Sequence, residues 1–326
     1  MAVPELDAAA VLRGDAAAIR ALRSALEDWG FFTLARGAID PSLLRRLEGL
    51  ARDFFALPEA EKQEVRMALG GKAWRGYFPL GAELTSGKPD GKAGLYFGTD
   101  DDPDDARPLH GRNLWPRRPP GLKEAVGEYM TAATELARGL MRGVALALDL
   151  EPDFWERTIT HEPTVLFRIF NYPDAGFDLG VGEHTDYGLL TVLCVDSSGG
   201  LQVRAPGGHW LDIPPPPPGE NALVVNIGDM LERLSGGRFR STPHRVVPTG
   251  TNRVSFPLFY DPGWDARPND ALGQLEECLG APPAESAGPR WDGQDLSQWH
   301  GTHGEYLQAK VQKCFPDLFA HAVFEN

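Results

Sequence analysis

The sequence predicts a mixed α+β protein in which a mainly helical first half precedes a β-rich core of the sandwich or jelly-roll type. Up to about residue 150, apolar residues recur at the spacing of amphipathic helices. After residue 160 the chain changes to short runs rich in Val, Leu, Phe and Tyr, separated by turn residues. Many short strands at this spacing are typical of a sandwich or jelly roll. A last helical segment over residues 304–314 is expected to close the chain.

Three helices are expected in the first half. Asp15 is a suitable N-cap for the first, Pro41 begins the second, and the third and longest follows Pro120. The Gly-, Asp- and Pro-rich stretch 70–120 is expected to be irregular, with a solvated acidic loop at 100–105. The apolar stripes of the three helices comprise Ile19, Leu22, Leu26 and Trp29; Leu43, Leu44, Leu47, Leu50 and Phe54; and Val126, Met130, Ala133, Leu136, Leu140, Val144 and Leu148.

The β-rich part contains six apolar runs that we expect to be strands. Glycine pairs and the Pro-Gly-Gly sequence 206–208 mark turns between them, and the five prolines 214–218 form a rigid extended connector. The runs read VLFRIFNY, GLLTVLCV, LQVR, ALVVNIG, HRVV and RVSFPLFY.

Composition and charge exclude several classes of protein. The 326 residues include 46 acidic and 32 basic side chains, for a net charge of −14, so a phosphate-binding surface for nucleic acid is not expected. The most apolar long stretch, 136–150, contains three charged residues and is too short to span a membrane. The first residues do not resemble a secretory signal, and the three cysteines form no disulfide framework. We therefore expect a cytoplasmic protein that acts on small molecules.

One candidate metal site is visible in the sequence. His184 and Asp186 stand two apart at the start of a β-type run, so on a strand they would share one face. His244, on a later strand run, is the natural third ligand. Two histidines and one carboxylate leave three positions of an octahedral ion open, which suits Fe(II) and O₂ chemistry. The alternative is a chance pair at an exposed strand end; a structural zinc site fits poorly, because no cysteine accompanies the three residues.

A second motif follows shortly after His244. Arg253 and Ser255 also stand two apart on a predicted strand, which places a guanidinium beside a hydroxyl. Such a pair is a good receptor for a buried carboxylate. The alternative is an arginine that pairs with a local aspartate.

The order of these motifs resembles the Fe(II)/2-oxoglutarate-dependent dioxygenases of the isopenicillin N synthase-like superfamily. The resemblance rests on HTDYGLLTVL, GLQV, VVNIGDMLERLSGGRFRSTPHRVV and RVSFPLFY, and extends to ALEDWGFFTL, KAGLYFG, GRNLWP and GEYLQAKVQKCFPDL. It therefore covers nearly the whole chain. It implies a double-stranded β-helix (jelly roll) flanked by N-terminal helices and a C-terminal helix, with the metal in the barrel mouth. The expected regions are an N-terminal mainly helical dioxygenase region (1–150), the dioxygenase core (151–262) and a C-terminal covering segment (263–326), which together are expected to form one integrated unit.

The resemblance also implies roles for individual residues. His184, Asp186 and His244 would bind Fe(II), while Arg253 and Ser255 would hold the distal carboxylate of 2-oxoglutarate. Tyr172 matches a family tyrosine that contacts this co-substrate, although many members read NYYP where this chain has FNYP. The implied reaction uses O₂ to convert 2-oxoglutarate to succinate and CO₂ while a small organic substrate is oxidised, with hydroxylation as the default outcome.

The substrate itself is not identified by the sequence. The N-terminal region and the C-terminal segment usually cover the pocket in this family, which would bring Arg75, Tyr77, Tyr96 and Phe97 near it. Arg168 is unusual in a buried strand and is expected to face the site. For the aromatic residues the alternative is a place in the core, and for Arg168 it is a structural or surface pair.

Three functional interpretations are compatible with the motifs. The main one is a 2-oxoglutarate-dependent oxygenase. The first alternative is an iron oxidase or cyclase that does not use 2-oxoglutarate, resembling isopenicillin N synthase, in which Arg253 would bind a substrate carboxylate. The second is a metal-binding scaffold without catalysis, which the intact ligand set disfavours. The oligomeric state is left open.

Overall fold

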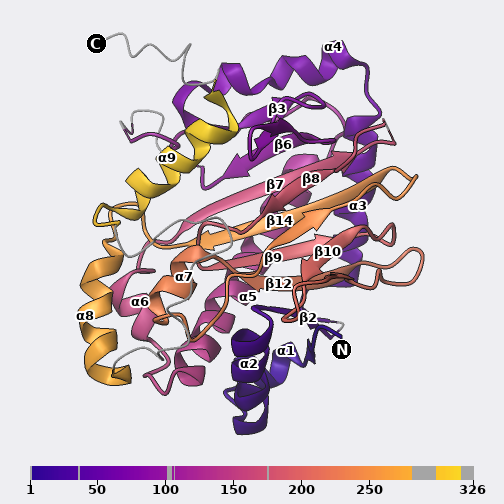
Figure 1. The fold of residues 1–326 in the computed structure, drawn as a ribbon. Helices are drawn as coiled ribbons and strands as arrows, with labels where there is room; N and C mark the ends of the chain where they lie inside the picture. The colour runs from indigo at the N-terminus through magenta and orange to yellow at the C-terminus, as the bar shows by residue number, and fades with distance from the viewer. Residues whose placement is uncertain are drawn as a thin grey trace.

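A computed structural model describes residues 2–316 except 36, 101–104, 106, 175 and 281–298. The described chain consists of two facing β-sheets, with long helices on the outer side of the larger sheet and shorter helices at its ends (Figure 1). The helices are α1 (Ala8–Leu12), α2 (Ala16–Asp28), α3 (Pro41–Phe55), α4 (Glu59–Lys62), α5 (Leu122–Ala147), α6 (Phe154–Thr158), α7 (Asp229–Leu234), α8 (Pro268–Leu279) and α9 (His303–Cys314), with 3₁₀ turns η1 (Gln63–Val65) and η2 (Met67–Ala73).

The described strands form one large sheet, one small sheet and a hairpin. The large sheet has the order β1-β2-β12-β9-β14-β7-β6-β3, and the small sheet has the order β11-β10-β13-β8. Strands β4 (Leu84–Thr85) and β5 (Lys88–Pro89) pair only with each other among the described residues. The remaining strands are β1 (Glu5–Leu6), β2 (Phe31–Leu34), β3 (Gly76–Phe78), β6 (Ala93–Gly98), β7 (Thr164–Tyr172), β8 (Val181–His184), β9 (Leu190–Val195), β10 (Leu201–Arg204), β11 (Trp210–Asp212), β12 (Ala222–Ile227), β13 (His244–Val246) and β14 (Arg253–Asp261).

The central strands of the large sheet are buried on both faces. Successive side chains of a strand point to opposite sides, so each strand supplies two different layers. One side packs on helices α3 and α5, where Phe167 and Ile169 of β7 and Phe256 of β14 join the main hydrophobic core with Leu140 of α5. The other side faces the small sheet, across a second apolar cluster that includes Val203. Two facing, mainly antiparallel sheets confirm the predicted jelly roll.

The sequence correctly predicts the long helices and their caps. The carboxylate of Asp15 accepts hydrogen bonds from the first turn of α2, Pro41 occupies the first position of α3, and α5 follows Pro120. The six apolar runs all contain strands, and α9 lies where the last helix is expected. Helix α8 and the short helices α1, α4, α6 and α7 are not among the expected elements.

The prediction of an irregular stretch over 70–120 is wrong in part. Strands β3 and β6 lie within it, and they extend the large sheet beyond β7. Every residue of β6 is buried, so its sequence does not alternate between apolar and polar residues. Its two glycines also make it look unlike a strand. Of the acidic loop at 100–105, residues 101–104 lie outside the described part of the chain. None of the helices within the described ranges is both long and apolar enough to cross a membrane.

The packing of α5 against the large sheet generates a stability prediction. Leu140 is fully buried in this layer, and Leu140→Ala should lower the free energy of unfolding by about 2–5 kcal/mol, because the cavity left behind cannot collapse fully. Thr131 lies on the exposed side of the same helix. Thr131→Ala should therefore change the free energy of unfolding by no more than about 0.5 kcal/mol. Urea unfolding of both variants measures the difference; equal effects would contradict the assignment of this helix face.

Candidate metal centre and co-substrate pocket

A cavity of about 450 Å³ opens between the two sheets. The side of the large sheet that faces this cavity is called the cavity floor. Its residues include Tyr96, Arg168, Phe170, Tyr172, Arg253 and Ser255. The wall of the cavity includes the β4–β5 hairpin and helix α9, which contributes Leu307 and Lys310. A segment of the N-terminal region and a helix near the end of the described chain therefore enclose a pocket whose floor belongs to the core.

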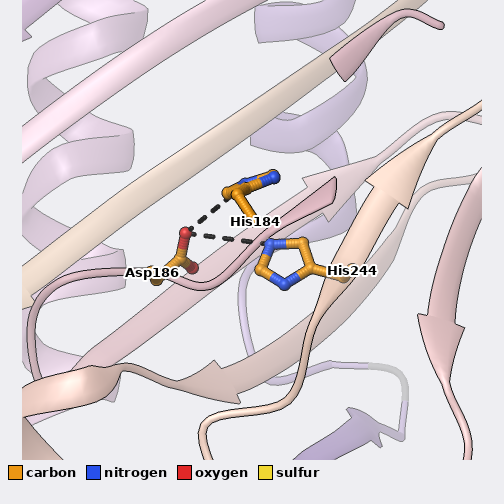
Figure 2. A group of neighbouring side chains, drawn as sticks. All are labelled: His184, Asp186 and His244. Atoms are coloured by element: carbon orange, nitrogen blue, oxygen red, sulfur yellow. Dashed lines mark ion pairs between the residues drawn. The ribbon is translucent and has the colours of Figure 1, made fainter. Parts of the chain in front are cut away.

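The three predicted metal ligands meet at the edge of this cavity. His184 is the last residue of β8 and His244 the first of β13, and the two are direct partners across the small sheet. Figure 2 shows Asp186 opposite both imidazoles: its Oδ1 lies 3.8 Å from His184 Nε2 and 3.7 Å from His244 Nε2. One ligand atom from each of the three residues can be chosen so that all lie within 4.8 Å of one another. A single ion can contact all three.

Asp186 reaches this position differently from what the sequence predicts. His184 ends a strand instead of beginning one, and Asp186 lies in the turn before β9, so the two do not share a strand face. The main-chain N–H of Asp229 donates to the carbonyl of Asp186 at 2.8 Å and holds the turn against α7. The turn needs glycine at position 188, because a Cβ there would lie 1.4 Å from Oδ1 of Asp261.

Neighbouring groups orient each ligand atom. His184 Nδ1 lies 2.8 Å from the carbonyl of Gly182, and His244 Nδ1 lies 3.1 Å from the carbonyl of Thr242. A carbonyl can only accept, so each Nδ1 carries the proton and each Nε2 presents a lone pair toward Asp186. The other carboxylate oxygen of Asp186, Oδ2, accepts from the Asn226 amide at 2.7 Å and from the Thr191 hydroxyl. Oδ1 is thus directed toward the two imidazoles.

The electrostatics of the three residues suit a divalent cation. Burial lowers the pKa of His184, and burial together with the adjacent His184 lowers the pKa of His244 to about 4. Burial alone would raise the pKa of Asp186, but His244, His184 and the hydrogen bonds from Thr191 and Asn226 lower it. Two neutral imidazoles and one carboxylate therefore converge at neutral pH. These three ligand atoms face the cavity. They fit Fe(II), and they leave coordination positions for other ligands.

The predicted carboxylate receptor also lies on the cavity floor. Arg253 and Ser255 share one face of β14, and Arg253 Nη1 lies 3.3 Å from Ser255 Oγ. The guanidinium lies 4.6 Å from the centre of the Tyr172 ring, and Ser255 Oγ lies 3.5 Å from the Tyr172 hydroxyl. Arg253 has no carboxylate at ion-pair distance among the described residues, so the alternative of a local aspartate partner is not supported. The three residues fit a dicarboxylic co-substrate that reaches the metal.

The pairing of β6 with β7 decides which predicted substrate contacts reach the cavity. Arg168 lies on the cavity floor, and so does Tyr96, its direct partner on β6. Phe97 follows Tyr96 on the same strand and therefore points to the other side, where it stacks on Trp115. The prediction for Phe97 is wrong, because strand alternation turns its ring into the core.

Two further predicted substrate contacts also lie outside the cavity lining. The hydroxyl of Tyr77 donates to Glu59, on the side of the large sheet that packs against the first helices. Arg75 is buried beside Gly98, where it donates to the carbonyl of Ala73. Both side chains are held by groups of the N-terminal region, and neither lines the cavity.

Other residues of the pocket were missed by the sequence analysis. Lys92 is buried in the wall and forms ion pairs with Glu83 and Asp90. Burial alone would lower the pKa of Lys92, but these two carboxylates raise it above its usual value. Trp74 also lines the pocket, and the partners of Asp186 lie on β9 and β12. Asn226 is brought to Asp186 only by the pairing of β12 with β9. The partners of Lys92 lie close to it in the sequence, but the three residues form no motif that marks a pocket.

Comparison with known proteins adds independent evidence. Residues 163–262 match the 2OG-Fe(II) oxygenase superfamily, and residues 3–118 match the N-terminal region of non-haem dioxygenases described from morphine synthesis. A probable iron/ascorbate oxidoreductase of Dictyostelium discoideum is 40% identical over 91% of this chain and 88% of its own length. The chain belongs to the 2OG-Fe(II) oxygenase superfamily. A homoarginine-6-hydroxylase of Arabidopsis thaliana is 34% identical to this oxygenase, over 93% and 91% of the two chains.

Solved structures agree with this assignment. A full-length Neurospora crassa protein in complex with alpha-KG superimposes on the oxygenase with a TM-score of 0.75, at 26% identity and with 95% of each chain covered. A putative 2OG-Fe(II) oxygenase family protein of Caulobacter crescentus gives a TM-score of 0.73 at 28% identity, covering 96% and 99% of the two chains. The protein is thus an oxidoreductase of the dioxygenase type that uses Fe(II) and 2-oxoglutarate and acts on a small molecule.

The support of Asp186 by Asn226 can be tested directly. Asn226→Ala should weaken Fe(II) binding by about 10- to 100-fold, because the carboxylate loses a partner that holds its orientation. Asn221→Ala serves as the control, since this asparagine hydrogen-bonds Glu48 away from the cavity. Anaerobic Fe(II) titration monitored by the change in protein fluorescence measures both variants. An unchanged affinity in Asn226→Ala would show that the hydrogen bond does not orient the ligand.

Proposed function

We propose that this oxygenase hydroxylates a small organic substrate, with Fe(II) held by His184, Asp186 and His244. In the same proposal Arg253, Ser255 and Tyr172 hold 2-oxoglutarate. The observation that carries the proposal is that one cavity is lined both by the converging ligand atoms and by a buried guanidinium that has no carboxylate partner among the described residues. A dicarboxylate bound to Arg253 at one end can then direct its other end toward the metal.

Each group of residues has a distinct task in this mechanism. Bound Fe(II) supplies the activation of O₂ that couples decarboxylation of 2-oxoglutarate to oxidation of a substrate C–H bond. The two imidazoles and Asp186 would hold this ion at the edge of the cavity, where the co-substrate can reach it. Arg253 and Ser255 orient the distal carboxylate by charge-assisted hydrogen bonds, so the reacting end keeps one position.

The walls of the cavity exclude water from the reacting groups. Leu166, Phe170, Phe259 and Leu307 line the cavity with apolar surface. A dry pocket strengthens the interaction of Arg253 with a carboxylate and protects reactive species from side reactions. A substrate that fills the remaining space completes this exclusion.

We also retain two proposals about the setting in which the enzyme works. A location in the cytoplasm is supported by three cysteines that are all free. A small-molecule partner in place of nucleic acid or a membrane is supported by the net charge of −14.

Removal of a metal ligand should abolish turnover. His184→Ala and Asp186→Ala each leave two ligands, so O₂ uptake that depends on 2-oxoglutarate should fall to the level without protein. His209→Ala, which changes an exposed histidine in the loop before β11, should keep the wild-type rate. Oxygen-electrode traces and anaerobic metal analysis of the purified variants measure the effect. Near-normal uptake in either ligand variant would refute the assignment of the metal centre.

The co-substrate role of Arg253 is tested by calorimetric titration of 2-oxoglutarate into anaerobic, Fe(II)-loaded protein. Arg253→Ala should weaken binding by about 10- to 100-fold, since hydrogen bonds to charged groups contribute about 1.5–3 kcal/mol. His244→Ala should remove the dependence of binding on the metal. Arg245→Ala is the control, because this arginine stacks on Trp210 outside the cavity.

The same titration separates the two enzymatic interpretations. Metal-dependent binding and release of one succinate per turnover support the oxygenase. Absence of 2-oxoglutarate binding in the intact protein would instead favour the iron oxidase that binds a substrate carboxylate at Arg253.

A further inference from the structure

A second buried guanidinium, that of Arg168, lies on the cavity floor. Only 2% of Arg168 is exposed, and its Nη1 donates to the carbonyls of Phe97 and Phe167, both at 3.0 Å. Within the described part of the chain, no carboxylate lies at ion-pair distance from it. Burial lowers the pKa of Arg168 to about 10, so it still carries a charge at neutral pH. A buried charge without a counter-ion is costly, which indicates that a ligand completes the site.

Two acids lie near Arg168, and one of them is already engaged. The carboxylate of Glu83 accepts from the Tyr96 hydroxyl at 2.7 Å and pairs with Lys92 at 2.7 Å. Asp261 lies at the end of β14 and lines the cavity; its Oδ2 is 3.5 Å from Nε2 of the buried His303, and its Oδ1 has no hydrogen-bond partner among the described residues. Both acids stabilise the charge of Arg168 through space, but neither forms an ion pair with it.

Two aromatic rings lie against the guanidinium of Arg168, which lines the cavity. Its central carbon lies 3.7 Å from the centre of the Tyr96 ring and 4.2 Å from that of Trp74. Trp74 lines the cavity, and its indole N–H is buried and has no hydrogen-bond partner among the described residues. Trp74 has a φ of 54°, a left-handed conformation that is unfavourable for a tryptophan. Within the described chain, a buried charge and a buried donor beside the cavity thus lack a counter-ion and an acceptor.

The position of this pair relative to the metal limits the ligand. Arg168 lies on β7, whereas Thr191, which supports Asp186, lies on β9, and β14 runs between them. Two strand spacings correspond to about 10 Å. The floor between them carries Phe259 and Pro257. This surface suits a short, flat, apolar group.

We propose that Arg168 and Trp74 bind the carboxylate of the substrate, which is a small organic acid oxidised at the end remote from that carboxylate. The floor then has two similar receptors: Arg253 beside Tyr172 takes the co-substrate, and Arg168 beside Tyr96 takes the substrate. The proposal rests on the proposed function, because it assigns the second receptor to the molecule that the same metal oxidises.

Matched acids and amides test the proposal in the intact protein. Phenylacetate and 3-phenylpropionate are titrated against phenylacetamide and 3-phenylpropionamide, under anaerobic conditions with Fe(II) and saturating 2-oxoglutarate. At saturation, 2-oxoglutarate occupies the site at Arg253, so the probe acids cannot bind there. Each pair differs only in its charged group, so the acids should bind at least about tenfold more tightly. Equal affinities, tighter binding of the amides or no binding of either acid at millimolar concentration would overturn the proposal.

Variants locate the binding and separate this proposal from the proposed function. Arg168→Gln should remove the preference for acids, and Trp74→Phe, which keeps an aromatic ring but lacks the N–H, should reduce it severalfold. The titrations are repeated without 2-oxoglutarate in Arg168→Gln and in the matched variant Arg253→Gln. Acid binding that is lost in Arg168→Gln and kept in Arg253→Gln supports the site even if the protein does not bind 2-oxoglutarate. The reverse pattern would place the acids at Arg253 and overturn the proposal.

Discussion

Every polar group on the cavity floor depends on one constraint, the two-residue alternation of strands that are buried on both sides. On β7, Arg168, Phe170 and Tyr172 face the cavity, while Phe167 and Ile169 pack in the core under α3 and α5. A shift of one residue in the pairing of β7 with β14 would exchange these two sets. The apolar core on the outer side therefore holds the register, and the register determines which charged side chains can reach a ligand.

The cavity also shows how buried charges are compensated. Lys92 pairs with Glu83 and Asp90, and the Asp90 carboxylate accepts from Thr85 of the β4–β5 hairpin and from the main chain of Gly182 on β8. This network links the outer wall to the strand that carries a metal ligand. In contrast, the two arginines of the floor contact aromatic rings, main-chain carbonyls and a hydroxyl, with no carboxylate at ion-pair distance in the described chain. The pattern separates charges that stabilise the fold from charges that are kept for ligands.

The sequence predicts the parts of this protein that depend on local patterns. The spacing of the apolar residues in α5 marks a helix, and the order of the HxD motif and the later histidine marks a metal centre, because each motif is read within a few residues. The choice between Tyr96 and Phe97 is different. Either aromatic could face the pocket, and only the pairing of β6 with β7 decides between them. Likewise, the turn that carries Asp186 depends on contacts with Asp229 and Asp261, which no local pattern reveals.

The floor and the wall of the cavity have different expected roles: the floor carries the groups that bind the reactants, and the wall selects the substrate. The metal ligands and both arginines belong to the two sheets and the turn beside them, where pairing on each side restrains them. The wall comes from the β4–β5 hairpin, near the middle of the N-terminal region, and from α9 near the end of the described chain. Helix α9 packs on the core through Tyr306 and Leu307, but neither segment belongs to the large sheet, so their cavity-facing side chains can change without shifting its register. In the proposed mechanism the wall therefore sets the size of the substrate, whereas Arg168 on the floor sets its charge.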